Sequence, residues 1–547
     1  MKKAWFLIAP VSLIFFSCAT QVAPSGGALD TIPPAVLKEV PESFSTDFRS
    51  KDIAITFDEY VHLDNLNEQL VISPPLSAMP EVKIKGKTLL IHLDDTLQDN
   101  KTYTFNFGSS IKDITENNVI ENFQYVFSTG AAVDTEQVNG KVFDAFTREP
   151  VKGVLVMLYD TPADSLPYLV KPSYFSRTGE DGGFLIKNIS GGDYKIFALR
   201  ETNNNYLFDS RDENIAFIHH PVTSGSDSLN LFLFTEKLPQ QLKRAAAIEP
   251  GQVMLVFQQP ADSLKYELLS ADPGIFAEEY SASKDTVNIW YKNTAADSLI
   301  FKIISPQSLS GDTVIVRLIS SEKLKSAQGK ATSGRGINTF RLSTQTNLSG
   351  KFDLNDSIRI TFSHPIESWD SVQVMLLKDS AEKISAAIKF TDVLKRNMYV
   401  AAPWKENTTY ALKIPHGTFT DVFGLKNDTL ELSFRTQQLN EYGTVKLDVN
   451  LHDTLENNVH LILQLLDENG KVARQNFLSK SRAVYYEYLT PAIYRLRMIV
   501  DENNNRQWDT GNYLKNMQPE TVIYNSQKIN VRANWDIEME WNLPEDR

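Results

Sequence analysis

The stretch DENNNRQWD, from Asp501 to Asp509, carries oxygen-bearing side chains at alternate positions. This spacing suits a calcium loop, in which a tightly turning backbone directs alternate oxygens at one hard cation. The candidate ligands are Asp501, Asn503, Asn505, the carbonyl of Gln507 and Asp509, with Asn512 at position twelve.

A second stretch, ETNNNYLFD, begins 300 residues earlier (501 − 201) and keeps the same alternation of oxygens. The shared spacing shows that the two loops have a common origin, but it does not by itself indicate a metal. In this first copy the candidate ligands are Glu201, Asn203, Asn205, the carbonyl of Leu207, Asp209 and Asp212.

Both stretches depart from the calcium pattern at two positions. Tyr206 and Arg506 replace the glycine that allows the sharp turn at position six, and neither stretch has a glutamate at position twelve. We therefore expect weak binding of Ca²⁺, with a dissociation constant of about 10⁻⁴–10⁻³ M. The alternative is an asparagine-rich turn without metal, since asparagine tolerates left-handed backbone.

Other candidate chemistry is sparse. Asp58 and Glu59 could act as paired carboxylates, but the matching strand end later in the chain has Ser363 and His364. A solvated strand end is the simpler interpretation. The sequence contains no HExxH, GxSxG, P-loop or dinucleotide-binding motif. We predict a non-enzymatic protein without catalytic residues; a hydrolase with an inter-domain site is the less favoured alternative.

Charge and patterning bound the class of protein. The 547 residues include 55 basic and 68 acidic ones, a net charge of −13, without a long basic block, so nucleic acid is not an expected partner. Short alternating runs such as DIAITF, TLLIHL and QYVFST are separated by Gly, Pro, Asn and Asp turns. This pattern predicts an all-β chain of tandem sandwiches rather than a helical fold.

The N-terminus reads MKKAWFLIAPVSLIFFSC, two lysines followed by an apolar run too short to span a bilayer. We predict a signal peptide over 1–17. Cys18, the only cysteine of the chain, follows it directly and resembles the acylated cysteine of bacterial lipoproteins. The resemblance implies a lipidated tether over 18–29 and a periplasm-facing outer-membrane location, with surface exposure as an alternative. A secretory peptide with a chance cysteine is the other interpretation.

An internal repeat organises the chain. ISGGDYKIFALRETNNNYLFD aligns without gaps to LTPAIYRLRMIVDENNNRQWD, so Tyr194 matches Tyr494 at an offset of 300 residues. Upstream, DIAITFDEY matches SIRITFSHP, and DNKTYTFNF matches ENTTYALKI. A two-domain unit has therefore been duplicated.

The first domain of each unit, 30–130 and 348–437, resembles the bacterial Ig-like domains of the S-layer-associated type through its ITF strand and its closing VFSTG. The next, 137–238, resembles the carboxypeptidase-regulatory-like, prealbumin-type sandwich, with Gly140, Gly182, Phe184 and Tyr194 at turn and core positions. The segment 440–547 is assigned as its repeat. The segment 239–347 is predicted to be a third, divergent Ig-like domain.

These features lead to one functional hypothesis. The chain resembles multidomain Ig-like lipoproteins of Gram-negative bacteria. We expect a lipid-anchored cell-envelope scaffold or adhesion module, its sandwiches arranged as an elongated rod, with a membrane and an envelope protein or glycan as partners. A glycan- or cell-wall-binding lipoprotein is the alternative, because exposed aromatic side chains on sandwiches can stack on sugars.

Overall fold

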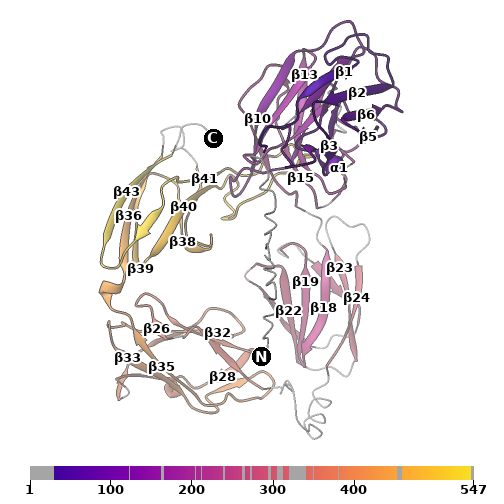
Figure 1. Cartoon of the computed structure of the whole chain (residues 1–547). Helices are drawn as coiled ribbons and strands as arrows, with labels where there is room; N and C mark the ends of the chain where they lie inside the picture. Colours follow the sequence, from indigo (N-terminus) through magenta and orange to yellow (C-terminus); the bar gives the residue numbers. More distant parts are fainter. Residues whose placement is uncertain are drawn as a thin grey trace, which may run out of the picture.

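A computed structural model describes residues 30–121, 123–161, 166–203, 205–210, 212–237, 241–260, 265–270, 274–281, 283–292, 297–304, 312–319, 341–348, 350–379, 381–451 and 459–543. Nearly all regular structure in it is β-strand, which confirms the predicted fold class of tandem sandwiches (Figure 1). The exceptions are the helix α1 (Leu66–Gln69) and the 3₁₀ turns η1 (Ser371–Gln373) and η2 (Leu439–Glu441). Within the described ranges, no helix is both long and apolar enough to cross a bilayer.

The first sandwich folds from alternating strands. In β2, Ile53, Ile55 and Phe57 point into the core while the residues between them face outward, as a half-buried strand requires. Its sheets have the orders β1-β2-β6-β5, β4-β7-β9 and β3-β8. The strands are β1 (Val36–Val40), β2 (Asp52–Phe57), β3 (Val61–Leu63), β4 (Val71–Ser73), β5 (Glu81–Lys85), β6 (Thr88–His92), β7 (Thr102–Asn106), β8 (Ile111–Asp113) and β9 (Gln124–Ser128).

The second sandwich pairs a sheet β13-β10-β17 with a sheet β12-β11-β14-β15, and β16 adds to β14. Strand β11, LVMLY, is buried on both faces, because one face fills the sandwich and the other lies under a second apolar cluster. The strands are β10 (Glu136–Asp144), β11 (Leu155–Tyr159), β12 (Tyr174–Arg177), β13 (Gly183–Ile189), β14 (Asp193–Arg200), β15 (Asn214–Phe217), β16 (Val222–Thr223) and β17 (Leu229–Leu233).

The third sandwich contains the sheets β18-β19-β22-β21 and β20-β23-β24. Val287, Ile289 and Tyr291 of β22 fill its core, while Trp290 points the other way, toward the fourth sandwich. The strands are β18 (Leu242–Glu249), β19 (Gln252–Phe257), β20 (Lys265–Leu268), β21 (Ile275–Tyr280), β22 (Thr286–Tyr291), β23 (Ser298–Ile304) and β24 (Asp312–Arg317).

The fourth sandwich repeats the first. Its order β25-β27-β32-β31 corresponds to β1-β2-β6-β5, and the pair β28-β34 corresponds to β3-β8. Its other sheet is β26-β35-β33-β29-β30. The strands are β25 (Thr344–Thr346), β26 (Lys351–Phe352), β27 (Ile358–Phe362), β28 (Ile366–Trp369), β29 (Met375–Lys378), β30 (Glu382–Ile384), β31 (Ala387–Phe390), β32 (Asn397–Ala401), β33 (Thr409–Ile414), β34 (Phe419–Asp421) and β35 (Leu430–Thr436).

The fifth sandwich repeats the second strand for strand. Its sheets have the orders β39-β36-β43 and β38-β37-β40-β41, with β42 added to β40, and β36 runs parallel to β43 as β10 does to β17. The strands are β36 (Gly443–Asn450), β37 (Leu461–Leu466), β38 (Val472–Leu478), β39 (Arg482–Leu489), β40 (Ala492–Val500), β41 (Val522–Tyr524), β42 (Ile529–Val531) and β43 (Asp536–Asn542).

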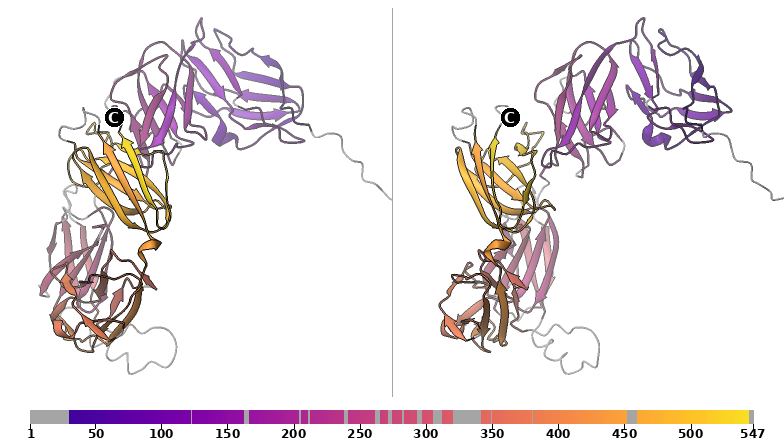
Figure 2. Two further views of the ribbon diagram at one scale, coloured as in Figure 1. Left: turned by 90° about the vertical axis from the view of Figure 1, so that its left-hand side faces the viewer. Right: turned by 60° about the vertical axis from the view of Figure 1, so that its left-hand side comes forward.

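The chain folds back on itself, so the expectation of an elongated rod is wrong. The fifth sandwich lies against the second, and the chain between them closes a ring from which the first sandwich projects (Figures 1 and 2). Hydrogen bonds from Arg148 Nε to the Val522 carbonyl and from Gln518 Nε2 to the Phe217 carbonyl, 2.7 and 2.9 Å long, cross this contact. A rod is excluded because these partners lie more than 300 residues apart in sequence.

Candidate functional site

The two candidate calcium loops follow equivalent strands. Glu201 comes directly after β14 and Asp501 directly after β40, and both side chains are almost fully buried. Their carboxylates accept hydrogen bonds from the backbone of the loop: Glu201 from Tyr206 N at 2.8 Å, and Asp501 from Arg506 N at 2.8 Å. The first acid of each stretch therefore holds the turn together.

Position six takes the backbone conformation that glycine usually supplies. Tyr206 and Arg506 both have φ 65°, in the left-handed region. A non-glycine residue there costs roughly 1–2 kcal/mol. The hydrogen bonds to the first acid offset that cost, so the missing glycine changes the residue type but not the turn.

The ninth-position acids gather the asparagine side chains. In the second loop, Asn503 Nδ2 lies 2.6 Å from Asp509 Oδ2, and Asn505 donates to the same oxygen. In the first loop, Asn203 and Asn205 donate to the two oxygens of Asp209, at 3.0 and 2.7 Å. The carbonyl candidates take part through their amides, since Leu207 N donates to Asn205 and Gln507 N to Asn505, both at 2.8 Å.

A buried glutamate completes each loop, and the sequence interpretation missed it. Glu520 accepts from the backbone nitrogens of Glu502 and Asp509, both at 2.9 Å. Glu213 accepts from Thr202 N at 3.2 Å and from Asp209 N at 3.1 Å. Both glutamates are buried. The sequence did contain a signal, because an acid precedes the strand that follows each loop. That acid does not stand at position twelve, where a calcium loop would have it.

The twelfth-position candidates do not reach the loops. Asp212 is exposed, and no hydrogen bond or ion pair joins it to its loop in the ranges described above. Asn512 Oδ1 accepts from Lys515 N, within a hairpin of its own. Sheet register explains the position of Asn512: Leu199 pairs with Ile215 but Ile499 with Val522, so the second copy has seven additional residues ((522 − 499) − (215 − 199)).

The acids of the second loop interact electrostatically. Burial raises the pKa of Glu520, and repulsion from Asp509 and Asp501 adds to the effect. Burial also pushes the pKa of Asp509 upward, but hydrogen bonds from Lys237, Asn503 and Asn505 outweigh burial and leave that pKa lowered. The oxygens suit a hard cation, yet they are engaged by loop N–H groups. Among the residues the structure describes, no group of three or more His, Cys, Asp or Glu is arranged to hold a metal.

The additional hairpin of the second copy makes the contact between the two copies. Thr510 Oγ1 donates to the Thr235 carbonyl at 2.7 Å, and Tyr513 N donates to Glu236 Oε1 at 2.6 Å. The Tyr513 ring packs edge-on against Phe197 and Phe217, with centroids 5.2 and 5.1 Å apart. The hairpin thus covers the outer apolar face of the second sandwich.

The same contact includes the loop acid. Lys237, which follows the second sandwich, forms an ion pair with Asp509. Asp509 therefore interacts with its own loop and with the other copy at once. Any change in the charge or position of this carboxylate acts directly on the contact.

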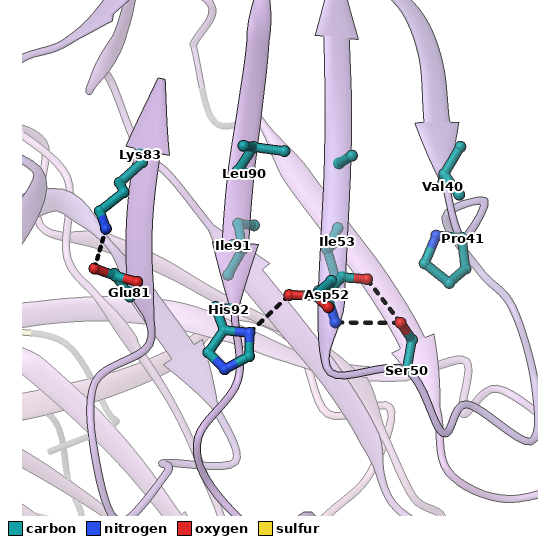
Figure 3. Close-up of a pocket in the computed structure, with 11 residues that line it drawn as sticks. Val40, Pro41, Ser50, Asp52, Ile53, Glu81, Lys83, Leu90, Ile91 and His92 are labelled. Atoms are coloured by element: carbon teal, nitrogen blue, oxygen red, sulfur yellow. Dashed lines mark hydrogen bonds and ion pairs between the residues drawn. The ribbon is translucent and has the colours of Figure 1, made fainter. Parts of the chain in front are cut away.

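The first sandwich carries a shallow depression of about 550 Å³ on the face of its sheet β1-β2-β6-β5 (Figure 3). The small Ala54 lies between Val40 and Leu90, whose side chains are both exposed. Asp52 and His92 form a pair at 2.6 Å beside it (Figure 3). The depression offers apolar surface with a charged rim.

Two further sequence candidates can be placed. Asp58 Oδ1 accepts from Ala35 N at 2.8 Å, so this acid fixes the chain entering the first sandwich. Burial and repulsion from Asp113 raise the pKa of its neighbour Glu59. Cys18, the predicted lipidation site, lies outside the described residues.

Comparisons with known proteins identify two of the sandwiches. Residues 30–129 and 337–436 match a family model described as the bacterial Ig-like domain, so the chain contains two such domains. The second match begins at 337, earlier than the predicted boundary at 348. No curated protein matches the chain.

Solved structures show distant likenesses. The S-layer protein rSbsC(31-844) is 11% identical over 90% of this chain and 67% of its own, with a TM-score of 0.15. BcpA, the major pilin subunit of Bacillus cereus, is 9% identical over 75% of this chain and 99% of its own, with a TM-score of 0.14. Titin-A168169 is 10% identical over 37% of this chain and 100% of its own, with a TM-score of 0.15. Scores this low support no argument about arrangement or function.

Proposed function

We propose that this protein is a non-enzymatic scaffold or adhesion module of the bacterial cell envelope, anchored in a membrane through acylated Cys18. The two bacterial Ig-like domains support a cell-envelope setting. The observation that carries the scaffold role is the contact between the second and fifth sandwiches, in which Tyr513 and the ion pair of Lys237 with Asp509 close the chain into a ring. Hydrogen bonds from Phe175 N to Ser73 Oγ and from Asn188 Nδ2 to Thr104 Oγ1, 3.0 and 2.9 Å long, join the first sandwich to this ring.

The anchor places the protein at the outer membrane, facing the periplasm, with surface exposure as the alternative. Its test is fractionation of cells that express the wild type or Cys18→Ala. Acylation of Cys18 predicts that the wild type sediments with membranes and that the variant appears in the soluble fraction. Recovery of the variant in the membrane fraction would contradict the anchor.

A glycan- or cell-wall-binding role is the alternative, and one observation favours it. Trp290 and Trp541 are buried, whereas Trp535 is 56% exposed with Arg532 above its ring. A pull-down on peptidoglycan and on polysaccharide, with Trp535→Ala beside the wild type, separates the roles. Loss of binding in the variant favours the glycan role, and no retention of the wild type favours the scaffold.

Calcium binding by the two Asn/Asp loops is a separate proposal. Support comes from the buried carboxylates, since Asp501, Asp509 and Glu520 lie close enough for their charges to raise the pKa of Glu520. A cation would relieve that repulsion. In the first loop, Glu201 and Glu213 stand in the same relation, and the charge of Glu213 adds to the burial that raises the pKa of Glu201.

A further inference from the structure

A pocket of about 660 Å³ lies between the second and fifth sandwiches. One wall is the turn after β10, and the other is formed by the β37–β38 turn and the strands β40 and β41. It lies on the contact that closes the ring. The side chains that matter here are Phe146, Arg148, Arg495, Arg497, Tyr524 and Lys528.

Three aligned positions distinguish this pocket from the matching face of the second sandwich. There, Met157 pairs with Phe197 and Phe197 with Phe217, and all three are buried in an apolar cluster. In the fifth sandwich the same row reads Gln464, Arg497 and Tyr524. All three positions are therefore polar in the fifth sandwich, where the Arg497 side chain contacts both Gln464 and Tyr524.

Arg497 is the centre of that row and is only 7% exposed. Its Nε donates to Gln464 Oε1 at 2.8 Å and its Nη1 to Tyr524 Oη at 3.1 Å, while the Phe146 ring covers its guanidinium at 4.3 Å. These groups are all neutral. Within the described part of the chain no carboxylate lies within ion-pair distance of Arg497. A buried cation without a counter-charge is costly, and further N–H donors of the guanidinium stay available.

Arg148 adds a second guanidinium from the other sandwich. Its Nε donates to the Val522 carbonyl at 2.7 Å, and its guanidinium lies 4.0 Å from the Phe232 ring centroid. Burial lowers its pKa, although Asp144 acts in the opposite direction. No ion pair of Arg148 occurs among the described residues. The pocket thus receives one partly desolvated cation from each copy.

The remaining charges of the pocket lie at its rim. Arg495 and Lys528 are exposed, as are the acids Glu149 and Glu468. Asp467, partly exposed, accepts hydrogen bonds from Asn469 N and Lys471 N at 2.9 Å, within its own turn. The buried part of the pocket is therefore cationic and aromatic, and the acids stand outside it.

We propose that this pocket binds a small ligand through an oxyanion, a carboxylate or a phosphate, which contacts Arg497 and is bridged to the second sandwich by Arg148. The planar guanidinium offers paired N–H donors that match such oxygens. The rest of the ligand lies against Tyr524. Because the cations come from both copies, the bound ligand also strengthens the closed ring. The proposal rests neither on the lipid anchor nor on calcium binding.

The test is titration of the full chain, followed by calorimetry and by the fluorescence of Trp508, whose ring is 4.9 Å from that of Phe146. The probes are galacturonate, its neutral counterpart galactose, and inorganic phosphate. The expected result is saturable binding of galacturonate or phosphate and none of galactose. Which of the two anions binds more tightly distinguishes a carboxylate ligand from a phosphate one.

Variants locate the binding. Arg497→Met should abolish it, and Arg148→Lys should weaken it about tenfold, because the ammonium group cannot reproduce the paired N–H donors of the guanidinium. Lys51→Ala, which removes an exposed charge from the first sandwich, should leave it unchanged. If Arg497→Met fails to fold, Arg148→Lys carries the test, since it keeps the positive charge and removes only the planar arrangement of donors. Absence of saturation with both anions in the wild type, or wild-type affinity in Arg148→Lys, overturns the proposal.

Discussion

His364 Nδ1 lies 2.6 Å from Asp421 Oδ2, and neither side chain is exposed to solvent. Glu249 of the third sandwich approaches the other ring nitrogen, with its Oε1 3.1 Å from Nε2. Trp290 and Phe423 pack against the imidazole. One buried histidine thus joins two carboxylates from two sandwiches.

The same positions in the first sandwich carry like charges. Val61 pairs with Asp113 as Ile366 pairs with Asp421, so Glu59 stands where His364 stands. After burial, repulsion from Asp113 is the largest cause of the raised pKa of Glu59. Histidine in place of the glutamate turns repulsion into attraction, and His364 also reaches Glu249 of the third sandwich.

The burial of His364 and its pairing with two carboxylates predict that the stability of the folded protein depends on pH. Burial alone lowers the pKa of His364, but hydrogen bonds with Asp421 and Glu249 outweigh it and raise the pKa to about 9. An unfolded histidine has a pKa of about 6.5. The contribution, on the order of 3 kcal/mol, is therefore complete below pH about 6.5 and is lost as the pH rises through about 9.

Thermal unfolding between pH 6 and pH 10 measures this effect. The wild type should lose stability between about pH 6.5 and pH 9, and His364→Gln should show a flatter profile. Equal slopes in the two proteins would remove His364 as the cause.

The packing of Tyr513 predicts that its side chain stabilises the contact between the second and fifth sandwiches. Tyr513→Ala removes a ring packed against Phe197 and Phe217 and should weaken the contact by about 2 kcal/mol. Leu514→Ala is the matched control, because its side chain is 72% exposed. Limited proteolysis of the chain between the two sandwiches should be faster in Tyr513→Ala only. Equal rates in both variants would mean that the ring contributes nothing to closure.

The close surroundings of Gly511 predict that a side chain at this position would disturb the same hairpin. An added Cβ would lie 2.7 Å from both the Met517 carbonyl oxygen and the Phe234 ring. Gly511→Ala should therefore cost about 1–3 kcal/mol at the contact. Far-ultraviolet circular dichroism should stay unchanged while solution scattering shows a larger radius of gyration. An unchanged radius would show that the hairpin adjusts.

Calcium makes a prediction about melting temperature. Millimolar Ca²⁺ should raise the melting temperature of the full chain, because a ligand that binds only the folded state stabilises it. The Asp501→Ala, Asp509→Ala double variant should lose the calcium-dependent part of that rise, whatever its own stability. Mg²⁺ serves as the control, since it requires a stricter octahedral site. If Ca²⁺ produces no shift in the wild type, the loops are turns.

The strands and the repeat could be read from the sequence, because alternation and duplicated motifs are local. DIAITF alternates and forms β2, and the match of Tyr194 to Tyr494 corresponds to identical strand orders. The predicted boundaries of the segments 137–238, 239–347 and 440–547 stay predictions. The ring could not be predicted, since it depends on a seven-residue difference between the copies ((522 − 499) − (215 − 199)) that shows only in the register of the sheets.

The candidate sites could be predicted from the sequence only in part. The spacing of Asp501 to Asp509 indicated the oxygens of a loop but not Glu520, which arrives from beyond the additional hairpin. The row of Gln464, Arg497 and Tyr524 gave no signal, because residues paired across strands are distant in sequence. Neighbouring strands, not neighbouring residues, build both sites.

The closed ring is the central claim, and one distance tests it most directly. Thr147 and Ser526 are exposed residues of the second and fifth sandwiches that line the same pocket. In a Cys18→Ser background, which removes the only native thiol, spin labels at Thr147→Cys and Ser526→Cys report their separation. The account predicts a short, narrow distance distribution. A long, broad distribution, as for a chain held open by the two intervening sandwiches, would contradict it.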